Sequence, residues 1–247
     1  MPRSARSKSA TDIYHIMLRG INRQHIFHDD EDNKKFLHTL SECKTNSEFE
    51  LFGYCLMGNH VHLLLKEGTE RLELIFKRIG VRYVYWYNRK YQRCGHLFQD
   101  RFRSEAVEND PYFLTALRYI HQNPKKAGLC KQLGEYKWSS YRDYTNNNGI
   151  TDREFALDII GENNFVRFMN EENDDNCLEF TDRENRITDE KLTEEIKKIC
   201  RLDAHLILNE PREVMREVLR EILKLEGVST RQLSRVTGIS KNVIWSL

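Results

Sequence analysis

Residues 50–66 read ELFGYCLMGNHVHLLLK, and this stretch decides the fold. It contains two apolar runs, 50–57 and 60–66, whose length and composition are typical of β-strands. The dipeptide Gly58-Asn59 between the runs favours a tight turn. The sequence therefore predicts an antiparallel β-hairpin, and the other elements are placed around it.

The second strand of this hairpin carries two histidines, His60 and His62, separated by a single valine. Side chains alternate along a strand, so both imidazoles project from one face and Val61 projects from the other. We expect the valine face to pack against the core and the imidazoles to lie close enough to share one metal ion. Such a pair also arises by chance, so its chemistry depends on what lies beside it.

The segments around the hairpin complete an alternating pattern of strands and helices. We expect strands at residues 14–19 and 104–108, and helices at residues 30–46, 71–91 and 110–123. The resulting order is β-α-β-β-α-β-α, with antiparallel strands in the middle. This order predicts the α+β class and a ferredoxin-like sandwich, an antiparallel sheet with its helices on one face.

The last of these helices carries two polar residues of interest. Asp110 suits the N-cap, and Pro124 ends the helical pattern. Tyr119 and Asn123 are four residues apart, so they lie on one stripe of the helix surface. Where this stripe meets the histidine strand, an amide oxygen of Asn123 can complete a metal site and Tyr119 stands one turn away. Taken alone, a tyrosine in this position is more often a packing residue.

A tyrosine beside a metal suits the breaking and rejoining of DNA strands. Attack by a phenolate on a phosphodiester gives a phosphotyrosine, which conserves the bond energy for rejoining. The ordinary pKa of tyrosine is about 10, so the nucleophile needs help to ionise. A metal ion contributes mainly by polarising the phosphate and placing it in line for attack.

The net charge of +1 hides an uneven distribution of charges along the chain. Residues 1–144 contain 24 Lys and Arg against 17 Asp and Glu, whereas residues 145–247 contain 15 against 21. The first part is therefore the one suited to a polyanion. The candidate contacts to DNA phosphates are Arg19, Arg23, Arg101 and Arg103 near predicted strand ends, and the less specific Lys77, Arg78 and Arg82 on the helix at 71–91.

Five short blocks of sequence follow one another along the chain: YHIMLRG at 14–20, GNHVHLL at 58–64, GHLFQDR at 95–101, YIHQNP at 119–124 and WSSYR at 138–142. Together they resemble the signature of the HUH single-tyrosine transposases, and above all the REP-associated tyrosine transposases. The resemblance covers roughly residues 11–144. It implies that His60 and His62 are metal ligands, that Tyr119 is the nucleophile, and that Asn123 is the third ligand, where relatives often have glutamine.

The same resemblance implies the substrate and the cofactor. The expected metal is Mg²⁺ or Mn²⁺, although two imidazoles alone would suggest zinc. The expected substrate is single-stranded DNA, often folded into a hairpin, and the expected intermediate is a 5′-phosphotyrosine. Both monomers and homodimers that exchange the tyrosine helix occur in the family. No secretory signal or apolar run of membrane-spanning length is present, so we expect a cytoplasmic protein without a membrane partner.

Two alternatives compete with this transposase hypothesis. A non-catalytic, sequence-specific DNA-binding regulator on the same fold would have lost the histidine pair or Tyr119, and both are present. An ordinary metal-dependent phosphoesterase would use more carboxylate ligands, and no acidic residue adjoins His60 and His62. Tyr87 and Tyr91 are the fallback nucleophiles if Tyr119 proves to be buried.

The composition predicts three parts along the chain. A catalytic domain at 1–144 is followed by an acidic connecting segment with short helices at 145–186 and by an all-α domain at 187–247. The polar run TNNNG at 145–149 marks the first boundary. The last 18 residues, 230–247, have the pattern of a helix-turn-helix, with a plain helical bundle as the alternative.

Overall fold

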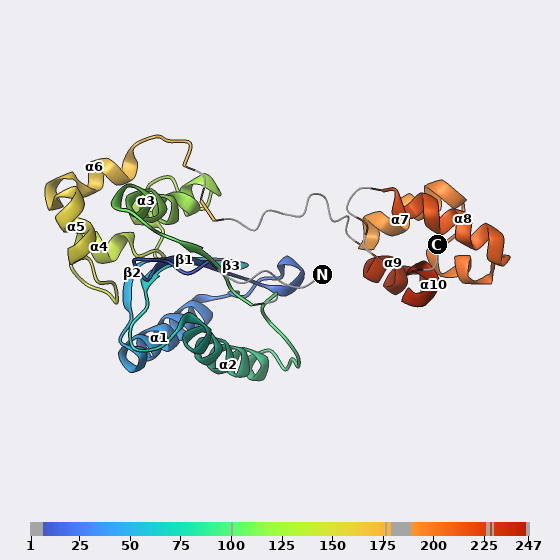
Figure 1. The fold of residues 1–247 in the computed structure, drawn as a ribbon, viewed down its shortest axis with the longest axis horizontal. Coiled ribbons are helices and arrows are strands. Elements are labelled where there is room, and N and C mark those ends of the chain that lie inside the picture. The colour runs from blue at the N-terminus through green and yellow to red at the C-terminus, as the bar shows by residue number, and fades with distance from the viewer. Residues whose placement is uncertain are drawn as a thin grey trace. The chain divides into compact units, whose positions relative to one another are not determined.

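The computed structural model describes residues 7–99, 101–175, 177–178, 189–225, 228 and 230–245. The chain divides into two compact units, Met1–Glu179 and Phe180–Leu247. Each unit has a hydrophobic core of its own. The first unit contains a β-sheet covered by helices, whereas the second is helical in its described residues (Figure 1).

A four-stranded antiparallel sheet lies at the centre of the first unit (Figure 1). The predicted hairpin is confirmed, and the strands lie in the order β2-β3-β1-β4. In the register of β1 and β3, Met17 lies opposite His62 and Arg19 lies opposite His60. Strand β1 therefore runs directly beside the histidine pair. The strands are β1 (Ile13–Arg19), β2 (Glu50–Met57), β3 (His60–Lys66) and β4 (Arg103–Ala106).

Two long helices cover one face of this sheet, as expected. They are α1 (Asp30–Ser47) and α2 (Leu72–Lys90), which pack against each other and against the face that carries Val61. A capping box between Asp29 and Asp32 begins α1, because each residue accepts a hydrogen bond from the other's backbone N–H.

Helix α3 (Asp110–Lys126) covers the opposite face, so the expectation that helices lie on one face is wrong for this helix (Figure 1). The reason is that the second face of the sheet also carries apolar side chains, among them Phe52 and Leu64. Leu64, on the histidine face of β3, is fully buried and packs in one core with Leu117 and Ile120 of α3. Two apolar faces need two covering layers. The α+β class and the antiparallel sheet are confirmed, but the histidines lie within a second core.

The ends of α3 also differ slightly from the predicted ones. The N-cap is Asn109, whose side chain accepts a hydrogen bond from the backbone N–H of Tyr112 at 2.9 Å, so Asp110 is the first helical residue. Pro124 lies inside the last turn rather than after it. This is possible because α3 continues only to Lys126 beyond the proline.

Three short helices extend the core under α3, and they belong to the first unit. Ala156, Phe165 and Met169 from this region are buried in the same core as α3. The predicted boundary after Tyr144 therefore falls inside a packed unit, whereas the second predicted boundary, after residue 186, lies outside the described residues. The helices are α4 (Tyr141–Asn146), α5 (Glu154–Ile160) and α6 (Phe165–Asn170).

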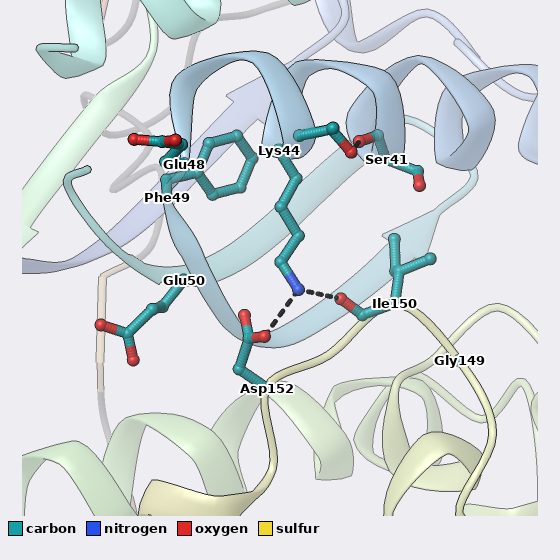
Figure 2. Close-up of a pocket in the computed structure, with 9 residues that line it drawn as sticks. Ser41, Lys44, Glu48, Phe49, Glu50, Gly149, Ile150 and Asp152 are labelled. Carbon is teal, nitrogen blue, oxygen red and sulfur yellow. Dashed lines mark hydrogen bonds and ion pairs between the residues drawn. The ribbon is translucent and has the colours of Figure 1, made fainter. Parts of the chain in front are cut away.

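One ion pair fastens this region to α1. Lys44 Nζ donates to Asp152 Oδ1 at 2.7 Å and to the Ile150 carbonyl at 2.9 Å (Figure 2). The other carboxylate oxygen of Asp152 accepts a hydrogen bond from the Leu51 backbone N–H at 2.7 Å. These contacts line a hollow of about 480 Å³ beside Glu50, which lies at the opposite end of the hairpin from His60.

The described residues of the second unit form helices around a small core. Buried side chains of Leu192, Leu219 and Leu233 come from three of them. Gly238 has φ +76°, a left-handed conformation that suits glycine and ends α9. The second unit is all-α in its described residues, as expected, and a helix-turn-helix formed by α9 and α10 stays a prediction. The helices are α7 (Asp189–Cys200), α8 (Arg212–Leu223), α9 (Thr230–Thr237) and α10 (Lys241–Trp245).

Short 3-10 segments join some of these elements. No helix in the described ranges is both long enough and apolar enough to cross a lipid bilayer. The 3-10 segments are η1 (Ile21–Arg23), η2 (Leu133–Glu135), η3 (Glu162–Asn164) and η4 (Ala204–Asn209).

Candidate metal and nucleophile site

The two histidines lie side by side at the start of β3. Their ring centroids are 5.1 Å apart, and the ring planes are nearly perpendicular at 82°. His60 is partly exposed, and its Nδ1 lies 2.7 Å from Oδ1 of Asn59. His62 is buried, with 1% of its surface exposed. The alternation of the strand thus places one accessible and one buried imidazole on the same face.

His62 contacts a polar side chain at each ring nitrogen. Its Nδ1 lies 3.0 Å from Nε2 of His15, and its Nε2 lies 3.2 Å from Nδ2 of Asn123. His15 comes from β1 and Asn123 from α3, so three separate elements meet at this ring. The stripe of α3 that contains Asn123 therefore faces the histidine strand.

Tyr119 lies in the same cluster, one turn before Asn123 on α3. Its ring centroid is 5.6 Å from that of His62 and 6.0 Å from that of His15, both in edge-on orientations. Lys126 Nζ lies 5.6 Å from the Tyr119 ring centroid. The tyrosine is buried, with 4% of its surface exposed, so the fallback nucleophiles have to be considered.

The fallback tyrosines lie far from the histidine pair. Tyr87 and Tyr91 are on α2, which covers the other face of the sheet. The Tyr87 hydroxyl donates to the carbonyl of His25 at 3.1 Å, and that of Tyr91 donates to Asp32 at 2.8 Å. Burial raises the pKa of Tyr87, and it raises the pKa of Tyr91 to about 12. Neither is placed to act with the histidines, so Tyr119 remains the candidate.

Hydrogen bonds on its outer side hold α3 against the rest of the unit. Gln122 Nε2 donates to the carbonyl oxygens of Met169 and Glu171, both at 2.9 Å. Arg118 Nε donates to Asp175 at 2.7 Å. These contacts fix the rotation of α3, and that rotation sets which stripe of the helix faces the histidines.

Burial makes both inner imidazoles neutral. It lowers the pKa of His15 to about 3 and the pKa of His62 well below its ordinary value. Electrostatic repulsion from His15 and His60 lowers the pKa of His62 further. A neutral imidazole has one nitrogen lone pair available, and it is the form that binds metal ions. His62 is therefore ready to act as a ligand at neutral pH.

The side chains of this cluster fit a divalent ion only as a mixed set of nitrogen and oxygen donors. No group of three or more His, Cys, Asp or Glu side chains in the described residues is arranged as a metal site. His60 and His62 supply two imidazoles, and the amide of Asn123 can turn its oxygen toward them by rotating about its last side-chain bond. Three ligands of this kind leave positions open for a phosphate and water.

Three of the predicted phosphate-binding arginines lie around this cluster. Arg19 pairs with His60 and Arg103 pairs with Met17 across neighbouring strands, so both share the histidine face. The backbone of Arg23 lies close to the histidine pair, since its carbonyl oxygen accepts a hydrogen bond from Nδ2 of Asn59, the residue before His60, at 3.2 Å. Arg101 is exposed in the loop before β4.

The other three predicted basic contacts are not brought to the histidines. Lys77, Arg78 and Arg82 lie on α2, across the sheet from the histidine face. Arg78 donates to both carboxylate oxygens of Glu70 at 2.7 Å, and Arg82 donates to Glu42 at 3.2 Å. Two of the three are thus engaged within the protein, while Lys77 is exposed.

Two members of the cluster, His15 and Lys126, are absent from the predicted site. A histidine in the middle of an apolar strand was the signal for His15, and its partner His62 is 47 residues away. Lys126 is seven residues after Tyr119, a spacing that returns to the same stripe of a helix. Neither sequence feature indicates a site by itself, because only the folded structure brings these residues to His62 and Tyr119.

Comparisons with known proteins find similar sequences among transposases. Residues 9–123 match the family model described as IS200-like transposase. The REP-associated tyrosine transposase of Escherichia coli strain K12 is 24% identical over 108 residues, which cover 42% of this chain and 61% of the relative. The alignment therefore spans about three fifths of the relative's length.

Of two solved structures that match the chain, one aligns well enough to show a common fold. The structure described as the REP-associated tyrosine transposase bound to a REP hairpin aligns with a TM-score of 0.52 and 18% identity, over 59% of this chain and 86% of that one. A putative transposase from Deinococcus radiodurans R1 aligns with a TM-score of only 0.34 and 17% identity, over 51% of this chain and 97% of that one. The first match shows a common fold.

Proposed function

Because residues 9–123 match the IS200-like transposase family, we propose that the first unit cleaves and rejoins single-stranded DNA with Tyr119 as its nucleophile. The observation that carries this proposal is the meeting of three elements at His62. Tyr119 and Asn123 of α3 both contact the His62 ring, and His60 lies beside it. A tyrosine can supply the nucleophile for strand transfer through a phosphotyrosine, and two imidazoles with an amide oxygen can hold the metal ion that polarises the phosphate.

In this proposal Tyr119 Oη forms a bond to the phosphorus of the scissile phosphodiester, and the bond from phosphorus to the 3′ oxygen breaks. The phenol loses its proton, and the departing 3′ oxygen gains one and becomes a free hydroxyl. The DNA stays attached through a 5′-phosphotyrosine, and a 3′ hydroxyl rejoins the strand by the reverse step.

His60, His62 and Asn123 would hold a divalent ion, Mg²⁺ or Mn²⁺. Such an ion supplies polarisation of the phosphate. The chain's own residues do the rest: α3 holds the phenol against the histidine strand, and burial keeps His62 neutral. Lys126 lies over the Tyr119 ring and favours the negatively charged phenolate.

Arg19 and Arg103 share the histidine face of the sheet, and the backbone of Arg23 lies beside Asn59. These three arginines would contact the DNA backbone. A folded hairpin is the proposed form of the substrate, since the structurally similar transposase was solved with a REP hairpin. No observation favours a non-catalytic regulator on this fold, because the histidine pair, Tyr119 and Asn123 are all present.

The test is covalent capture of DNA. A labelled single-stranded oligonucleotide that folds into a hairpin is incubated with the protein and Mn²⁺ or Mg²⁺, and the products are separated on a denaturing gel. We expect a protein–DNA adduct that depends on the metal and is lost in Tyr119→Phe. Tyr85→Phe is the matched control, because Tyr85 is 70% exposed on α2 and lies across the sheet from the histidines.

Two results count against the proposal. An adduct that survives Tyr119→Phe would remove Tyr119 as the nucleophile. Metal-dependent cleavage without any adduct would instead favour an ordinary phosphoesterase, whose products leave without a covalent intermediate.

A further inference from the structure

His15 is a buried histidine that the proposed reaction does not use. It lies in the middle of β1 with none of its surface exposed. Its Nε2 lies 3.0 Å from His62 Nδ1, while its Nδ1 has no hydrogen-bond partner among the described residues. A buried nitrogen without a partner destabilises the folded state. Packing alone therefore gives no reason for an imidazole here, where a phenyl ring would fill similar space.

The register of the sheet brings the two rings together. His15 pairs with Leu64 and Met17 pairs with His62, so His15 and His62 are diagonal neighbours on one face. Diagonal neighbours are within reach of long or aromatic side chains. Among the described residues, His62 Nδ1 meets the side chain of His15 at the place where a carboxylate or a backbone carbonyl is the usual partner.

The polar contacts of His62 fix the positions of the hydrogens in this chain of rings. An amide nitrogen can only donate, so the contact of Asn123 Nδ2 with His62 Nε2 requires a bare Nε2. The single N–H of a neutral His62 is then on Nδ1, and it donates to His15 Nε2. His15 carries its own hydrogen on the unpartnered Nδ1.

We infer that His15 is a positioning residue, which accepts the hydrogen bond from His62 Nδ1 and so keeps the Nε2 lone pair of His62 available for the metal. The inference rests on the proposed metal site. Histidines that bind metals almost always donate their second nitrogen to an acceptor, which fixes the tautomer and the ring orientation. Here the acceptor is a second neutral histidine.

The choice of a histidine follows from the depth of the site. A carboxylate in the place of His15 would be a buried charge without a positive partner, because the rings beside it are neutral or aromatic. A neutral imidazole offers an acceptor without that charge. The imidazole of His15 leaves its own Nδ1 without a partner among the described residues, which costs some folding stability.

The tautomer of His62 can be read directly. In metal-free protein labelled with ¹⁵N histidine, two-bond correlation spectra distinguish a protonated from a bare ring nitrogen. We expect His62 to carry its proton on Nδ1 in the wild-type protein. In His15→Phe, which removes the acceptor and keeps a ring, we expect the signal of this tautomer to weaken or split.

Metal affinity gives the second readout. We expect calorimetric titration with Mn²⁺ to show about 10- to 100-fold weaker binding for His15→Phe than for the wild-type protein. His15→Gln should recover much of the affinity, since its side-chain oxygen can accept the same hydrogen bond. The free energy of unfolding should change little in His15→Phe, because one unpaired N–H replaces another.

His121 offers a matched control for the loss of a buried histidine. It is also fully buried, its pKa is also lowered to about 3, and its Nδ1 also lacks a partner among the described residues. Its Nε2 lies 2.8 Å from Ser140 Oγ and not near His62. His121→Phe should therefore leave the Mn²⁺ affinity within about twofold of the wild-type value, an allowance for indirect packing effects.

The outcomes separate this inference from the proposed function. If wild-type protein binds no Mn²⁺, the proposed metal site fails, and the His62 spectrum still decides whether His15 sets the tautomer. If the wild type binds Mn²⁺ and His15→Phe binds it equally well, the inference fails while the metal site stands. A proton on Nε2 of wild-type His62 would overturn the inference directly.

Discussion

At the scale of single residues, the site combines side chains that are individually ordinary. Strand alternation predicts that His60 and His62 share a face, and helix periodicity predicts that Tyr119 and Asn123 share a stripe. The structure places the two pairs together at the His62 ring. Local spacing does not encode the contact with His15, because the pairing of β1 with β3 creates it. Residues joined only by tertiary pairing are thus the ones that sequence patterns miss.

A substitution of Lys126 tests whether its positive charge favours the phenolate form of Tyr119. We predict that Lys126→Met lowers the rate of adduct formation at neutral pH by roughly 2- to 5-fold, the effect expected from an exposed cation beside an aromatic ring. Loss of the positive charge disfavours the phenolate, so the pH–rate profile should move toward higher pH. Single-turnover assays from pH 6 to 10 would measure both.

Two variants control this prediction. Lys126→Arg keeps the charge and should keep most of the rate, whereas Lys125→Met removes a neighbouring exposed lysine and should leave the profile in place. A profile that moves equally in Lys125→Met would show that the general charge of the surface, and not the position of Lys126, is responsible.

At the scale of elements, the sequence predicts the four strands and the helices α1, α2 and α3, but it predicts neither α4 nor the faces of the sheet that the helices cover. A strand with apolar residues on one face and both polar and apolar residues on the other is usually predicted to have its second face exposed to solvent. Leu64 and Phe52 instead belong to a second core under α3. The covering helix comes after β4 in the chain, and no local pattern tells which side of the sheet it returns to.

Two glycines give opposite predictions for the same substitution. Gly80 lies inside α2, and a Cβ added there would meet nothing within 4 Å. We predict that Gly80→Ala raises the free energy of unfolding by about 0.5–1 kcal/mol, because glycine loses more backbone entropy in a helix than alanine. Urea denaturation followed by circular dichroism would measure the change.

Gly53 of β2 is the contrasting site. A Cβ there would lie 2.8 Å from Leu117 Cδ1, at the point where α3 approaches the sheet. Gly53→Ala should lower the free energy of unfolding by about 1–3 kcal/mol, through overpacking between α3 and the sheet. If Gly80→Ala destabilised the protein as much as Gly53→Ala, entropy in α2 would not be the deciding effect.

At the scale of the whole molecule, the charge pattern has a different meaning once the units are known. The sequence suggests a basic catalytic part followed by an acidic remainder. However, residues 145–178 alone hold eight Asp and Glu against two Lys and Arg, and this segment packs within the first unit. Some of its acids contact α3 and α1, as Asp175 does with Arg118 and Asp152 does with Lys44. The acidic excess is therefore partly structural and says little about the second unit.

The division into units predicts that the chemistry survives removal of the second one. All residues of the candidate site lie in the first unit, and the described cores of the two units share no residue. We predict that a protein ending at residue 178 folds and forms the Tyr119-dependent DNA adduct at a rate within about threefold of the full chain, the factor that corresponds to 0.6 kcal/mol. The full chain should unfold in two transitions, the truncated one in a single transition.

A protein ending at residue 144, the boundary that the sequence suggests, is the matched comparison. It loses the buried side chains of Ala156, Phe165 and Met169, and it loses the acceptors of Gln122 and Arg118 that fix the rotation of α3. We expect it to aggregate or to unfold at much lower temperature, and to form no adduct. If the 144-residue protein were as stable and active as the 178-residue one, α3 would hold Tyr119 against His62 without the segment that follows it.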